Sequence, residues 1–195
     1  MISRAVILLL ILSLSATLAG AGEIREFSIP TLERLGNELT RASQSPDRGA
    51  SDAARKRAGE TAAAALRGKL FDTRYDYFVL SDPDGKRLLV YALAVAKYTD
   101  QVVMAGHFRV TVSADGTKAE RVDPLSKSLA HSGPMKTDAL ALYLIQLVSN
   151  KPVETLIYTS NLAKKPIYVR TPDGKTWVVG EGKMVVAASK RSNSR

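Results

Sequence analysis

The sequence predicts an α+β fold, because the spacing of its apolar residues changes along the chain. Between residues 30 and 70 apolar residues recur at helical spacing, whereas from residue 73 the period becomes that of extended strands. Three aspartate-glycine pairs separate the extended runs, at Asp84-Gly85, Asp115-Gly116 and Asp173-Gly174. This dipeptide favours tight hairpins because both turn residues tolerate a positive φ. We therefore expect N-terminal helices, an antiparallel sheet built from hairpins, and one buried helix packed across that sheet.

The first helix is predicted near residues 30–42. Ser28 is a typical capping residue, and Pro30 suits a first turn, where its missing N–H needs no partner. Leucines at positions 32, 35 and 39 then form one apolar face. Residues 43–50 are small and polar and contain proline and glycine, which is typical of a linker. Residues 22–50 are therefore assigned to an N-terminal helix and linker.

The rest of the chain, residues 51–188, is predicted to form a single domain of one helix, three hairpins and further elements. The helix runs from a cap at Ser51 or Asp52 to about Leu70, with alanine supplying most of its helical propensity. The hairpins join strands near residues 73–81 and 86–97, 102–113 and 117–122, and 166–171 and 176–180. A last strand is expected near 183–188, followed by a disordered basic tail over 189–195.

The buried helix is placed at residues 136–149, because the segment from Ala139 to Ile145 is apolar on nearly every side. Pro152 would end it. Residues 153–159 fit two structures: an extended segment places threonine and valine on one face, whereas a helix brings Val153, Leu156 and Ile157 together. We interpret this segment as a strand.

Residues 1–21 have the pattern of a cleaved secretory signal peptide. Arg4 precedes an unbroken apolar run over residues 5–12, and the small residues Ala19, Gly20 and Ala21 fit a cleavage site between Ala21 and Gly22. A retained membrane anchor needs about 20 apolar residues, and here serine and threonine interrupt a shorter run. We therefore expect a periplasmic or secreted protein without an integral membrane segment after processing.

Composition limits the classes of function. The chain has no cysteine, which excludes a lipid anchor on a thioether, disulfides and a cysteine nucleophile. Removing the signal leaves 27 basic and 19 acidic residues, a net charge of +8. The basic residues are spread along the chain with few aromatics between them, unlike the stacking surfaces that bind single-stranded nucleic acids. We expect a protein or an anionic envelope component as partner, and no nucleic acid.

Catalytic residues are scarce in this sequence. Only two histidines exist, His107 in an alternating run that predicts a solvent-facing position and His131 in a loop beside serines. A serine nucleophile needs a histidine that a carboxylate orients, and nothing in the spacing indicates such a set. Two histidines without cysteine also make a poor zinc site. We predict no catalytic residue, no metal and no cofactor, and keep His131 as a weak candidate for binding.

Trp177 is the second weak candidate for binding. It is the one tryptophan of the chain and lies in the strand predicted over 176–180. On an exposed strand face a tryptophan can anchor a partner. The alternative, which we favour, is that Trp177 packs in the core.

Residues 71–186 resemble small exported proteobacterial proteins of unassigned function. The resemblance lies in the run from Lys165 to Thr171, in Asp173-Gly174 and in Trp177. These are turn and strand residues, so the resemblance implies no site residue. The order of a helix followed by an antiparallel sheet is also similar to cystatin-like exported inhibitory domains, at the level of fold alone.

Three functions are consistent with these observations. The first is an exported, non-catalytic binding or accessory protein of the cell envelope. The second is an inhibitor of an extracytoplasmic enzyme, and the third is a hydrolase that uses serine and histidine. An envelope binder should have a contiguous basic face, an inhibitor an exposed apolar loop or edge, and an enzyme a pocket that holds His131 near a carboxylate.

Overall fold

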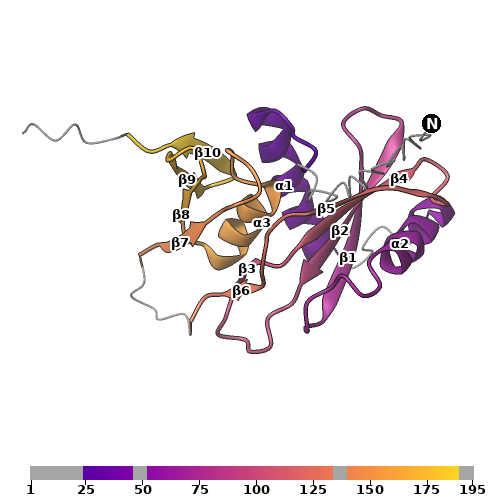
Figure 1. Cartoon of the computed structure of the whole chain (residues 1–195), viewed down its shortest axis with the longest axis horizontal. Helices are drawn as coiled ribbons and strands as arrows, with labels where there is room; N and C mark the ends of the chain where they lie inside the picture. Colours follow the sequence, from indigo (N-terminus) through magenta and orange to yellow (C-terminus); the bar gives the residue numbers. More distant parts are fainter. Residues whose placement is uncertain (1–23, 46–51, 134–139, 189–195) are drawn as a thin grey trace, which may run out of the picture.

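The computed structural model describes residues 24–45, 52–133 and 140–188, and arranges them in four layers (Figure 1). In order, the layers are helix α2, a four-stranded sheet, helices α1 and α3, and a second four-stranded sheet. The α+β class is confirmed. The predicted signal peptide with Ala21 and Gly22, most of the linker and the basic tail lie outside the described residues.

The first two helices lie close to their predicted positions. Helix α1 spans Ile29–Gln44, and Ser28 caps it by accepting a hydrogen bond from the backbone N–H of Thr31. Helix α2 spans Ala53–Ala65, and the Asp52 carboxylate caps it through the N–H of Ala54 at 2.8 Å. The small alanine face of α2 lets the helix lie directly on the first sheet.

The first sheet contains the first two predicted hairpins and has the strand order β1-β2-β4-β5, with every neighbouring pair antiparallel. Its strands are β1 (Tyr75–Ser81), β2 (Arg87–Ala94), β4 (Phe108–Ser113) and β5 (Ala119–Pro124). Helix α2 covers one face and helices α1 and α3 cover the other, so both faces of this sheet are buried. The polar residues Arg109 and Thr111 of the central strand β4 therefore do not reach solvent.

The second sheet has the order β10-β9-β8-β7, and α3 connects its two parallel strands β7 and β8. The third predicted hairpin, β8–β9, and the last strand are confirmed. The elements are β7 (Leu142–Ile145), α3 (Glu154–Ala163), β8 (Ile167–Arg170), β9 (Thr176–Gly180) and β10 (Lys183–Val186). Buried side chains of β8, β9 and β10 pack inward on α1 and α3.

The predicted helix over 136–149 is wrong where the structure describes that segment. Residues 142–145 form β7, and Leu140 before it is 90% exposed. The predicted strand over 153–159 is wrong as well, because these residues begin helix α3, with Leu156 and Ile157 in the core. A short run of apolar residues fits a helix and a strand equally, and partners far along the chain decide between them.

The predicted strand over 102–113 is broken in two. β3 (Val103–Ala105) and β4 are separated at Gly106, whose φ of 107° is open mainly to glycine. An added Cβ there would lie 2.6 Å from the Leu129 side chain. β3 pairs with a short strand that was not predicted, β6 (Ala130–His131).

Candidate functional site

The outer face of the second sheet carries a row of apolar side chains that crosses all four strands. Tyr143 of β7 lies beside Tyr168 of β8, then Val178 of β9 and Val185 of β10. A second row begins with Ile145 and continues with Arg170 and Thr176. We call these seven residues the outer face.

The outer face includes four of the nine large exposed hydrophobic residues in the described chain, Tyr143, Ile145, Tyr168 and Val185. Seven of the nine large exposed hydrophobic residues in the described chain belong to this sheet or flank β7. They are Leu140, Tyr143, Ile145, Leu147, Tyr168, Val185 and Val186. Single exposed hydrophobic residues are ordinary, but a contiguous patch with polar surroundings is typical of an interaction surface.

A basic hollow adjoins the apolar row where β9 and β10 meet the end of α3. It has a volume of about 640 Å³, and Val178 and Val185 of the outer face are part of its wall. Its charged residues are three lysines and one glutamate, Lys164, Lys165, Lys183 and Glu181. Lys164 is exposed and ends α3 in the left-handed conformation, whereas the exposed Lys183 forms an ion pair with the largely buried Glu33 at 3.2 Å.

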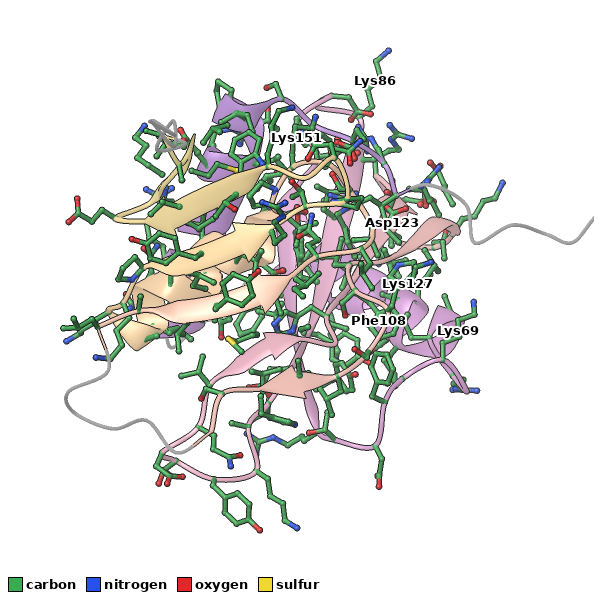
Figure 2. The ribbon with its side chains drawn as sticks, turned by 60° about the vertical axis from the view of Figure 1, so that its left-hand side comes forward. Lys69, Lys86, Phe108, Asp123, Lys127 and Lys151 are labelled. Carbon is green, nitrogen blue, oxygen red and sulfur yellow. The ribbon has the colours of Figure 1, made fainter. Side chains whose placement is uncertain are left out.

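The two edges of the second sheet are shielded in different ways. At β10, side chains of α1 bond to the strand: Glu33 accepts the N–H of Met184, and Asn37 donates to the carbonyl of Gly182. At the other edge, β3 and β6 lie beside β7 (Figure 2), with a cavity of about 50 Å³ between them. Both edges are therefore obstructed for strand addition, and the face is the accessible part of the sheet.

The two weak candidates for binding lie apart. Trp177 is 8% exposed and belongs to the core cluster beneath the outer face, which is the packing that we favoured. His131 is exposed on β6. Within residues 24–45, 52–133 and 140–188 no hydrogen bond or ion pair reaches its imidazole ring, so the structure brings no carboxylate to it.

His107 is buried, and its predicted solvent-facing position is wrong. It lines cavities together with residues of α3 and is 2% exposed. Its Nδ1 accepts the N–H of Ala94 at 3.0 Å. Burial lowers the pKa of His107 from 6.5 to about 4, although the Val103 carbonyl opposes the shift. The ring is neutral near pH 7 and acts as a structural acceptor.

Acidification is expected to destabilise the fold through His107. The unfolded chain binds a proton as the pH falls below 6.5, whereas the folded chain does so only near pH 4. The free energy of unfolding should therefore fall by about 2–3 kcal/mol between about pH 7.5 and about pH 4.5. Urea titrations at both pH values measure this loss. Because His131 is exposed, His131→Asn should show the full fall in the free energy of unfolding between the two pH values, and His107→Asn should show a smaller fall. An equal fall in both variants would contradict the role of His107.

A buried charged cluster lies between the first sheet and α3. Arg109 donates to Glu154 at 2.6 Å and to Asp123 at 2.8 Å, and all three side chains are almost completely buried. Tyr91 donates to the same Glu154 oxygen at 2.7 Å. Burial lowers the pKa of Arg109, but Glu154 and its other neighbours raise it more, so the guanidinium stays charged.

The N-terminal segment with Arg25 and Phe27 covers one side of this cluster. The Phe27 ring is contacted by the guanidinium groups of Arg25 and Arg109, each 4.7 Å from the ring centroid. The carbonyl of Arg25 accepts from Arg109 as well. Arg25 and Phe27 are partly exposed, but Tyr91, Arg109, Asp123 and Glu154 beneath them are enclosed by protein, so the cluster holds layers together.

The described residues contain no group of three or more histidine, aspartate or glutamate side chains placed to hold a metal ion. Over the same residues, none of the helices is both long and apolar enough to cross a membrane. No family model, no curated protein and no solved structure matches this chain.

Proposed function

We propose that the protein is an exported, non-catalytic binding protein of the cell envelope, and that the outer face of its second sheet binds another protein. The observation that carries the proposal is the row Tyr143–Tyr168–Val178–Val185, which lies across four strands and faces solvent. Tyrosine and arginine are enriched at protein interfaces, and this face contains both. The signal pattern of residues 1–21 supports a location outside the cytoplasm.

The same surface favours a protein partner over a catalytic role. A hydrolase requires His131 to lie in a pocket with a carboxylate, whereas its exposed ring has no such partner in the described chain. An inhibitor requires an exposed apolar loop or edge, and the exposed leucines Leu140 and Leu147, which flank β7, fit such a loop. Inhibition of an extracytoplasmic enzyme is therefore the second candidate function, and it would use the same face.

The proposal predicts selective loss of a partner when the face is made polar. Tagged mature protein is used to capture proteins from the envelope fraction, in parallel with the variant Tyr143→Ser combined with Tyr168→Ser. The amount of partner captured by the variant should be at least about tenfold lower than that captured by wild type, because interface tyrosines often contribute more than 1–2 kcal/mol each. The mass of protein recovered from the periplasm reports whether the chain begins near Gly22.

Tyr98→Ser is the matched control, since Tyr98 is 54% exposed and Tyr143 is 58% exposed, but Tyr98 lies in the loop after β2. A partner that the control retains and the double variant loses would support the outer face as the binding surface. Equal capture by all three proteins would contradict it. If the partner is an enzyme, its activity with and without the captured protein distinguishes inhibition from accessory binding.

A further inference from the structure

The charges beside the outer face restrict the chemistry of the partner. We infer that the partner presents an acidic polypeptide segment whose carboxylates enter the basic hollow while its apolar side chains lie on the row of Tyr143, Tyr168, Val178 and Val185. This inference rests on the proposed function. It goes further, because it names the kind of partner and a second group of contacts.

Charge complementarity is the first argument for an acidic partner. Lys164, Lys165 and Lys183 contribute three positive charges to the hollow, and Glu181 contributes one negative charge. Glu33 lies behind Lys183 and neutralises part of its charge, but the Lys183 side chain is 72% exposed, so a partner's carboxylate can reach its ammonium group from the solvent side. Arg170, on the outer face itself, adds a further cation. A second copy of this basic chain would be repelled at such a surface.

The shape of the site is the second argument, and it favours a polypeptide over a lipid surface. The lysines surround a recess of about 640 Å³ whose wall includes Val178 and Val185. A planar layer of lipid headgroups would contact the rim of a recess and leave its interior unfilled. A chain with protruding carboxylate side chains can fill the recess and at the same time cover the flat apolar row beside it.

The mode of contact follows from the shielded edges. Glu33 and Asn37 already occupy backbone groups at the β10 edge, next to the hollow. The partner therefore cannot extend the sheet there by backbone pairing. Recognition would come from side chains on the face, so a segment with acidic side chains at one end and apolar side chains along the rest of the same side fits this surface best.

The test uses as the probe a fluorescent synthetic peptide in which a run of glutamates is followed by a run of valines, with a glutamine-valine peptide of the same order as its uncharged analogue. Binding to the full mature protein is followed by fluorescence anisotropy at low and high salt. The variant Lys164→Gln with Lys183→Gln should weaken binding of the acidic peptide by about 3- to 10-fold and reduce its salt dependence. The glutamine-valine peptide should bind more weakly than the acidic one.

A matched control removes the same two charges elsewhere, in Lys69→Gln with Lys86→Gln. Figure 2 shows Lys69 and Lys86 on the side of the molecule built by the first sheet and α2, away from the second sheet. If both double variants weaken binding equally, overall charge and not the hollow binds the peptide, and the inference fails. It also fails if the acidic peptide does not bind, or if phosphatidylglycerol vesicles bind the protein and displace the peptide.

The outcome can be separated from that of the proposed function. Should the lysine variant still capture the native partner while the Tyr143→Ser, Tyr168→Ser variant does not, the outer face binds a partner and the acidic class is wrong. Should the lysine variant lose the native partner in the way that it loses the peptide, both the surface and the chemistry of the partner are supported.

Discussion

Replacing Arg109 by methionine is expected to lower the free energy of unfolding by about 3–5 kcal/mol, because it leaves buried carboxylates without their cation. Arg109 contacts Glu154 at 2.6 Å and Asp123 at 2.8 Å, and none of these groups reaches water. Against a total stability of about 5–15 kcal/mol, this loss is a large fraction. Urea denaturation of the purified variant measures it.

Arg121 provides the control for Arg109, since it bonds to the same Asp123 carboxylate but is 43% exposed. Arg121→Met should cost less than about 1 kcal/mol, as expected for ion pairs at the surface. Combining Arg109→Met with Glu154→Gln should recover part of the loss by removing one unpaired charge. Equal stability of Arg109→Met and wild type would show that the buried cluster does not hold the layers together.

Local patterns predicted much of this fold because the responsible residues act on their immediate neighbours. Ser28 and Asp52 cap helices that begin beside them, and each aspartate-glycine pair lies at a hairpin that joins adjacent strands. Capping and turn formation depend on bonds within a few residues. The sequence therefore indicated where these elements begin and which strands are neighbours.

The burial of polar residues in the first sheet could not be predicted in the same way. His107, Arg109 and Thr111 alternate with apolar residues, which is typical of a strand with one solvent-facing side. In the structure that side faces α1 and α3. One carboxylate partner of Arg109 is Glu154, which lies 45 positions away. No local signal connects such a pair, and only the packing of layers brings them together.

The candidate site was missed for a related reason. Trp177 and His131 were selected as single residues, whereas the outer face arises from the register of four strands. Tyr143 belonged to a predicted helix, so its position beside Tyr168 was hidden. A parallel pair such as β7 and β8 has no turn between its strands, and its register depends on the helix that connects them.

Ile157→Asp is expected to unfold the domain, and Leu140→Asp is expected to leave its stability within about 0.5 kcal/mol of wild type. Ile157 is completely buried in α3, between α1 and the two sheets, whereas Leu140 is 90% exposed. Burying an unpaired carboxylate costs several kcal/mol, and losing the packing of an isoleucine adds about 2–5 kcal/mol. Together these losses approach the whole stability of a domain.

Circular dichroism during thermal unfolding, with the soluble yield of each variant, measures this difference. The pair of variants tests which apolar segment is the central helix, because a buried helix over 136–149 would make Leu140→Asp the destabilising change.

Gly36 of α1 gives an independent check on the same packing, since a Cβ there would lie 2.6 Å from both the Glu154 carbonyl and the Ile157 Cβ. Gly36→Val should therefore destabilise by about 1–3 kcal/mol by forcing the two helices apart. Wild-type melting of both Ile157→Asp and Gly36→Val would mean that α3 does not pack against α1 in the core.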